Sequence, residues 1–142
     1  MVYNLERFKK VQKRDFETAL SEIRNGRKES HWIWYIFPQL KELGYSSTAK
    51  YYGIEGREEA ESYIKDDVLK ARLIEISEVL LSLDSSNPSE VMGYPDDLKL
   101  KSCMTLFSIV APEIDVFGKV LDKFYSGRKD EKAIELLGKH SY

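Results

Sequence analysis

The sequence predicts a compact all-α domain built from about seven to nine short and medium helices. Along nearly the whole chain, apolar residues recur three and four positions apart, which is the period of an α-helix. Glycines, prolines and helix-capping residues interrupt this pattern at intervals typical of ordinary helix lengths. The chain has 142 residues, of which 42% are hydrophobic, so it can bury a core without disulfides or metal. Residues 1–142 are therefore predicted to form a single domain.

The N-terminal part of the chain predicts two amphipathic helices. Asn4 is the expected cap of the first helix, and Asp15 is the expected cap of the second. Gly26 supplies the residue type that usually ends a helix in a left-handed conformation. The inward faces consist of Leu5, Phe8 and Val11 in the first helix and Phe16, Ala19, Leu20 and Ile23 in the second.

The segment from His31 to Phe37 has no polar face and is rich in aromatic and β-branched residues. Propensity alone would make it a buried strand. No second strand signal exists to pair with it, and an isolated strand would leave backbone groups unsatisfied. We therefore predict a short, buried helical segment that Ser30 caps and Pro38 ends.

The remaining helices follow from their start and stop signals. A helical pattern begins near Arg57, breaks or bends near Asp66 and Asp67, and resumes as far as Leu83. A short helix with Pro88 in its first turn, a longer one from Pro95 to Pro112 and two C-terminal helices separated by Gly127 complete the prediction. The predicted interior residues are Trp34, Phe37, Leu73, Leu106, Phe107 and Phe124.

Composition excludes several classes of protein. The 22 cationic and 24 anionic residues give no excess charge for coating nucleic acid or anionic lipid, which argues against nucleic acid as a partner. The single cysteine, Cys103, and two histidines do not form a zinc-binding pattern, so no metal site is predicted. No stretch has the length of a signal peptide core or of a membrane span, and the expected location is cytoplasmic. The first thirty residues are nevertheless basic, whereas residues 57–97 are acidic.

The segment 26–39 contains the densest polar and aromatic cluster. Its hydrogen-bond donors follow a glycine cap and precede a helix, where the helix dipole favours an anion: Arg27, Lys28, Ser30 and His31. Trp32 and Trp34 offer stacking faces for a flat ring. The alternative is that His31 and both tryptophans belong to the core and that the two cations are merely solvated.

A second cluster lies in the segment 94–105. Asp97, Lys101 and Thr105 are spaced four residues apart, so they lie on one helical face. A carboxylate, an ammonium and a hydroxyl would converge there. The alternative is an exposed ion pair between Asp97 and Lys101, which contributes a few tenths of a kcal/mol.

These segments resemble a known family. The motif Gly-Arg-Lys-x-Ser-His-Trp-x-Trp-x-Ile-Phe-Pro-Gln at residues 26–39, Leu-Gly-x-Ser at 43–46, Tyr-Gly-Ile at 52–54 and Asp-x-Lys-Leu-Lys-Ser at 97–102 are similar to the uncharacterised family called domain of unknown function 1810. The resemblance implies a mainly α-helical fold without an established activity. Members are sometimes labelled calpastatin, but that inhibitor is a long disordered chain, and the helical pattern here contradicts the label. Cys103 stands where the family more often has serine, which argues against a catalytic thiol.

The resemblance also implies that the two clusters meet around one pocket, because the family retains their polar residues. The combined donors favour an anionic small molecule of the nucleotide or sugar-phosphate type. His31 is the candidate general acid or base, and Asp97 would orient it or activate water. The candidate ligand-binding residues are Arg27, Lys28, Ser30, Trp32, Gln39, Lys99, Lys101 and Ser102.

Two classes of function follow. The first is a ligand-binding domain, with hydrolase or transferase activity as an extension. The chain has no P-loop, nucleophile elbow or dinucleotide glycine motif, so neither a reaction nor a cofactor is identified. The second is a non-catalytic protein–protein interaction domain, which exposed Trp32 and Trp34 side chains would favour.

Overall fold

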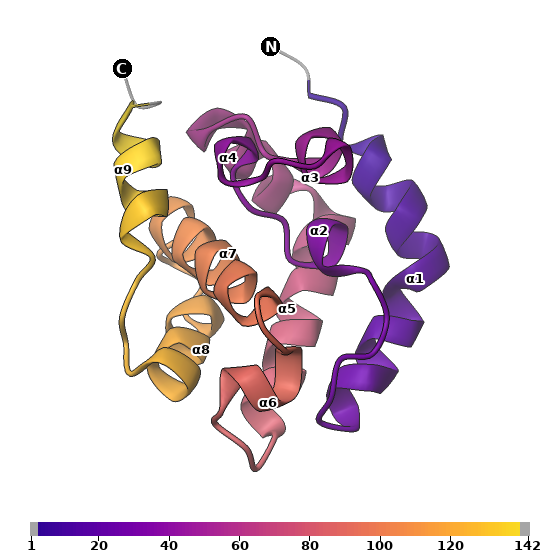
Figure 1. The fold of residues 1–142 in the computed structure, drawn as a ribbon. Coiled ribbons are helices and arrows are strands. Elements are labelled where there is room, and N and C mark those ends of the chain that lie inside the picture. The colour runs from indigo at the N-terminus through magenta and orange to yellow at the C-terminus, as the bar shows by residue number, and fades with distance from the viewer. Residues whose placement is uncertain (1–2, 140–142) are drawn as a thin grey trace.

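The computed structural model describes residues 3–139. Within this range every regular secondary-structure element is a helix, which confirms the all-α prediction. Figure 1 shows the arrangement. The elements are α1 (Glu6–Arg24), α2 (Ile33–Ile36), the 3-10 helix η1 (Lys41–Leu43), α3 (Ser47–Tyr52), α4 (Arg57–Lys65), α5 (Asp67–Ser82), α6 (Pro88–Met92), α7 (Asp96–Val110), α8 (Val116–Tyr125) and α9 (Glu131–Lys139).

Helices α5 and α7 form the centre of the fold. Helix α5 packs against α1, α4 and α8, whereas α7 packs against α4, α6, α8 and α9 (Figure 1). The sequence of α7 is apolar around most of its circumference, as expected for a helix that is covered on several sides. Leu100, Met104, Leu106 and Phe107 of α7 are fully buried.

Helix α1 is one continuous helix, so the prediction of two helices was wrong. Its buried positions keep helical spacing straight through Asp15, from Phe8 and Val11 to Phe16 and Leu20. Because this apolar stripe is uninterrupted, packing against α5 favours one long helix. Neither predicted cap acts as one: the residue before the helix is Leu5, without a side-chain cap, and the Asp15 carboxylate accepts hydrogen bonds from Arg14 and Tyr35 instead.

Helix α2 confirms that the segment 31–37 is helical, but its start differs from the prediction. The residue preceding the helix is Trp32, and Ser30 does not cap it because the Ser30 hydroxyl donates to Glu22 on α1. Phe37 ends the helix directly before Pro38, as predicted. Within this segment, Phe37 is buried and Trp34 is only partly buried, which corrects the expectation for Trp34.

The segment 39–56 is the part of the fold that the helical period did not predict. A single parallel β-bridge joins Leu40 to Ile54. The Lys41 amide donates to the Ile54 carbonyl at 2.8 Å, and the Ile54 amide donates to the Gln39 carbonyl at 2.9 Å. Between Leu40 and Ile54, η1 and α3 turn the chain back on itself.

Two glycines permit this close return. A Cβ atom at Gly53 would lie 2.4 Å from the Lys41 Cα, and one at Gly44 would lie 2.4 Å from the Ala49 Cβ. Both distances are shorter than real Cβ atoms allow, so each of these close contacts requires glycine. Ser46 caps α3 by accepting a hydrogen bond from the Ala49 amide. The result is a fixed position for α3 beside the N-terminal half of α1.

The other predicted boundaries are confirmed. Asp66 caps α5 by accepting from the Val68 and Leu69 amides, and Asn87 caps α6, in which Pro88 occupies the first turn. Gly127 follows α8 with φ +77°, the left-handed conformation expected of a terminating glycine. Within residues 3–139, none of the helices combines the length and apolarity needed to cross a membrane.

Phe107→Ala tests the core. The Phe107 ring is fully buried and lies 5.3 Å from the Tyr63 ring and 5.9 Å from the Phe117 ring, centroid to centroid. Removing it should lower the free energy of unfolding by about 3 to 5 kcal/mol, through lost burial and the cavity that remains. Urea denaturation measures this change. Leu98→Ala, on the exposed side of α7, is the control and should change stability by less than about 1 kcal/mol. Equal effects of the two variants would contradict the assigned helix face.

Candidate functional site

The loop between α1 and α2 is held by one carboxylate, that of Glu22. Its Oε1 accepts hydrogen bonds from the Glu29 amide, the Ser30 amide and the Trp32 indole, each at 2.8 Å. Its Oε2 accepts from the Ser30 hydroxyl at 2.5 Å. Burial raises the pKa of Glu22, but the hydrogen bonds from Ser30, Glu29 and Trp32 outweigh burial and lower the pKa to about 2. Glu22 is therefore ionised when it holds the loop in place.

The Glu22 contacts change the roles predicted for Ser30 and the tryptophans. The Trp32 side chain is only 1% exposed, so its ring is part of the core and not an open stacking face, which corrects that prediction. The Ser30 hydroxyl is occupied by Glu22. The Trp34 ring carries the Lys99 ammonium 4.1 Å from its centroid, so a cation occupies one of its faces.

The two predicted clusters do lie side by side, and they meet through an ion pair. The Lys28 ammonium lies 2.7 Å from the Asp96 carboxylate at the start of α7, and the Lys99 ammonium lies 3.1 Å from the same carboxylate. The Lys28 amide also donates to the Val91 carbonyl at 2.7 Å. The single Asp96 carboxylate thus contacts two ammonium groups, and its ion pair with Lys28 ties the loop to α7.

His31 and Lys101 line two different cavities. The cavity at His31, which we call the His31 cavity, has a volume of about 280 Å³. Its walls are Arg14, Asp15, Thr18, Ser30, His31, Trp32 and Tyr35. The cavity at Lys101 is lined by Arg128, Lys129, Glu131 and Ile134 of the C-terminal part of the chain. His31 and Lys101 therefore line separate cavities, and these cavities do not form the shared pocket that the sequence predicts.

The other predicted residues are also separated. Asp97 accepts a hydrogen bond from Ser89 at 2.9 Å, and within residues 3–139 no hydrogen bond joins it to His31. Ser102 donates to the Leu98 carbonyl and to Asp130. The remaining two residues differ in exposure: Gln39 is buried, whereas Arg27 is exposed.

A cavity between α1 and α3, which we call the α1–α3 cavity, has the most uniform charge. Its volume is about 400 Å³. It is lined by three cations, two tyrosines and one valine: Arg7, Lys10, Arg14, Tyr51, Tyr52 and Val11. No carboxylate belongs to this lining. The cations are spaced three and four residues apart on α1, so one helical face presents all of them.

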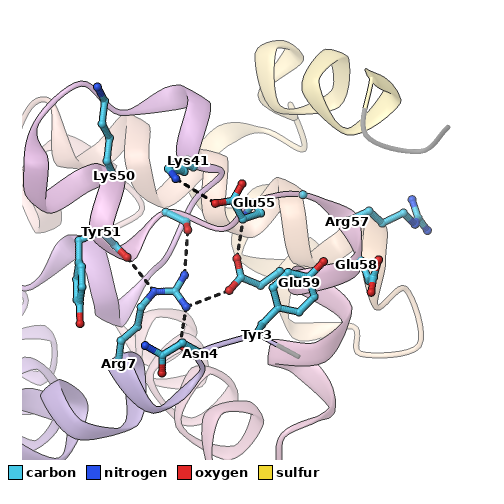
Figure 2. Close-up of a pocket in the computed structure, with 12 residues that line it drawn as sticks. Tyr3, Asn4, Arg7, Lys41, Lys50, Tyr51, Glu55, Arg57, Glu58 and Glu59 are labelled. Carbon is cyan, nitrogen blue, oxygen red and sulfur yellow. Dashed lines mark hydrogen bonds and ion pairs between the residues drawn. The ribbon is translucent and has the colours of Figure 1, made fainter. Parts of the chain in front are cut away.

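Arg7 fixes the geometry of this cavity. Its guanidinium donates to the Tyr51 carbonyl at 2.8 Å, to the Gly53 carbonyl at 3.0 Å and to the Asn4 carbonyl at 2.6 Å. It also forms an ion pair with Glu59 at 3.0 Å (Figure 2). Arg7 is therefore a positioning residue that holds α3 on α1.

Lys10 and Arg14 differ in their partners. The Arg14 Nε atom donates to Asp15 at 2.8 Å, and this contact is the main reason that the pKa of Asp15 lies below its usual range. Tyr35 donates to the same carboxylate, and burial together with Asp15 raises the pKa of Tyr35 to about 12. Lys10 is exposed, and no ion pair or hydrogen bond joins its ammonium to the part of the chain that the structure describes.

The cavity in Figure 2, which we call the α3–α4 cavity, has a volume of about 700 Å³ and a mixed charge. Its cations are Arg7, Lys41, Lys50 and Arg57, its carboxylates are Glu55, Glu58 and Glu59, and its rings are Tyr3 and Tyr51. Arg7 and Tyr51 also line the α1–α3 cavity, and Arg14 lines both the α1–α3 and the His31 cavity. The three cavities therefore form a row along α1.

Sequence reasoning missed the residues at the centre of this row. The basic character of the first thirty residues was the available signal, because Arg7, Lys10 and Arg14 keep helical spacing on the side of α1 opposite its apolar stripe. Tyr51 had no comparable signal. Within the described residues, no group of three or more histidine, cysteine or acidic side chains is placed to hold a metal ion.

Comparisons with known proteins give a family and a fold. The family model described as "Protein of unknown function (DUF1810)" matches residues 2–137. The crystal structure of the conserved hypothetical protein Rv1873 from Mycobacterium tuberculosis has a TM-score of 0.93 to this chain and 39% sequence identity. That match covers 96% of this chain and 97% of Rv1873. No curated protein matches the sequence.

Glu22→Gln tests the carboxylate at the base of the loop. The folded state lowers the pKa of Glu22 from 4.5 to about 2, so Glu22 stabilises the fold fully above pH 4.5 and loses this contribution as the pH falls to about 2. The contribution is on the order of 3 kcal/mol. Urea denaturation should show that the variant has a lower free energy of unfolding than the wild type at pH 7. Between pH 7 and pH 3 the variant should lose less of this free energy than the wild type does. Glu17→Gln, an exposed carboxylate of α1, should behave as the wild type. An unchanged acid dependence in Glu22→Gln would contradict the role.

Proposed function

The chain belongs to the DUF1810 family of proteins of unknown function, and we propose that it binds an anionic small molecule in the α1–α3 cavity. The observation that carries this proposal is the charge of the lining: three cations face the cavity and no carboxylate does. Its volume of about 400 Å³ lies within the range of small-molecule sites.

The cations are placed at a cost to the fold. Lys10 and Arg14 are four residues apart on α1, and like charges at this spacing destabilise a helix by a few tenths of a kcal/mol. Arg14 is partly neutralised by Asp15, whereas Lys10 lacks a carboxylate partner among the described residues. A bound phosphate would relieve this repulsion and gain charge-assisted hydrogen bonds.

Tyr51 supports a ligand that carries more than a phosphate. Its side chain is 58% exposed, although its backbone carbonyl is held by Arg7. The ring lies at an edge-to-face angle to the Tyr52 ring, 4.8 Å between centroids. An exposed ring on a fixed backbone, next to cations, suits the apolar face of a nucleotide or of a sugar phosphate.

The His31 cavity supports a catalytic extension of this proposal. It shares Arg14 with the α1–α3 cavity, so a ligand group that extends past Arg14 would meet the His31 imidazole and the Thr18 hydroxyl. His31 would then act as the general acid or base in hydrolase or transferase chemistry, the role that histidine takes most often.

The alternative of a non-catalytic protein–protein interaction domain has less support. It requires an exposed apolar surface formed by the tryptophans. Trp32 is buried, and the Lys99 ammonium occupies a face of the Trp34 ring. The charged lining of the α1–α3 cavity favours a small anion instead.

Lys10→Ala tests the proposed site. Isothermal titration calorimetry with inorganic phosphate, adenosine 5′-monophosphate and glucose 6-phosphate should show affinity reduced about 5- to 10-fold by the loss of one charge. Binding to the wild type should weaken as salt is raised. Lys13→Ala removes an equal charge from α1 outside the cavity lining and should change affinity less than 2-fold. Equal losses in both variants, or no binding of any probe, would contradict the proposal.

A further inference from the structure

We propose that the ligand is a sugar phosphate whose phosphate lies in the α1–α3 cavity and whose hydroxyl-bearing sugar lies in the α3–α4 cavity. This inference rests on the proposed function and decides between the two ligand classes that the cations alone leave open. It follows from the difference in charge between two cavities that share a wall.

The two cavities are neighbours at Arg7 and Tyr51, which line both. The Arg7 side chain is nearly buried and is held by the carbonyls of Tyr51 and Gly53, so this shared wall is rigid. Tyr51, whose carbonyl accepts from Arg7, belongs both to the all-cationic lining and to the mixed lining. A ligand that crosses Tyr51 therefore meets two different environments.

The α3–α4 cavity does not suit a second phosphate. Of its carboxylates, Glu59 is buried and is satisfied by Arg7 at 3.0 Å and by the Glu55 amide at 2.7 Å. The Glu55 carboxylate is more than half exposed and contacts the Lys41 ammonium at 3.0 Å, and Glu58 lies beside Arg57 on the same wall (Figure 2). Both carboxylates would repel a second anion, whereas the Glu55 oxygens keep lone pairs beyond the Lys41 contact and accept hydrogen bonds from hydroxyl groups.

The same lining favours a sugar over a nucleobase. Lys41, Lys50, Glu55, Arg57 and Glu58 give the cavity charged walls, and a flat apolar ring among them would desolvate these groups without replacing their hydrogen bonds. Hydroxyl groups both donate and accept, so a sugar satisfies carboxylates and ammonium groups together.

Glu55→Gln tests this inference, because the two possible roles of Glu55 predict opposite changes in the affinity for sugar phosphates. If Glu55 accepts sugar hydroxyls, the variant should bind the preferred sugar phosphate about 5- to 10-fold more weakly, while inorganic phosphate binds equally well or slightly better. If Glu55 only repels anions, the variant should bind both more tightly. Calorimetry with ribose 5-phosphate, glucose 6-phosphate, glycerol 3-phosphate, adenosine 5′-monophosphate and inorganic phosphate measures these affinities.

Glu17→Gln is the matched control, because it removes one carboxylate from α1 outside both linings and should leave all affinities unchanged. A pentose or hexose phosphate should bind the wild type at least 10-fold more tightly than glycerol 3-phosphate and more tightly than adenosine 5′-monophosphate. The inference is overturned if no sugar phosphate does so, or if Glu55→Gln strengthens sugar-phosphate binding. Failure of phosphate binding itself, with Lys10→Ala without effect, would instead overturn the proposed function.

Discussion

The hydrogen bonding of the Glu22 carboxylate is the interaction on which the arrangement of the N-terminal half depends. Two amides, one hydroxyl and one indole N–H of the loop 29–32 converge on it, so the loop has one conformation relative to α1. The same loop carries Lys28, whose ion pair with Asp96 joins it to the start of α7. A buried carboxylate with this many donors is favourable because each donor replaces water that burial removes. Glu22 thus fixes the loop that joins α1 to α2, and the Lys28 side chain of this loop contacts α7, which is distant in sequence.

The helices were predictable because their signals are local. Apolar spacing, Asp66 and Asn87 as caps, and Gly127 as a terminator depend on neighbours within one or two turns. Asp15 shows the limit of this reasoning, since a residue that suits a cap also suits the middle of a helix where it has side-chain partners. The β-bridge between Leu40 and Ile54 was not predictable. It depends on the close approach of Gly53 to the Lys41 backbone, and apolar periodicity gives no sign of such a contact.

The candidate site was harder to predict than the fold, for a different physical reason. The sequence predicts that the loop 27–31 and α7 offer hydrogen-bond donors to a ligand, and the ion pair between Lys28 and Asp96 agrees with the expectation that these segments lie together. A donor count does not show which donors the folded chain already uses. Lys28, Ser30 and Trp32 are occupied by carboxylates of the protein itself. Their contacts within the fold account for these three residues without a ligand.

The residues that the fold leaves unpaired therefore say more about binding than the residues that a motif retains. Lys10 has no carboxylate partner among the described residues, although Asp66 and Asp15 neutralise its helix neighbours Lys9 and Arg14. Tyr51 presents an exposed ring on a backbone that Arg7 immobilises. Packing does not explain either feature, since neither side chain contributes to the core. Both features border one cavity, and a rigid wall with unsatisfied positive charge is what binding an anion at low entropic cost requires. The cavity walls of α1 and α3 thus combine a stable scaffold with one charge, that of Lys10, that no carboxylate of the described residues neutralises.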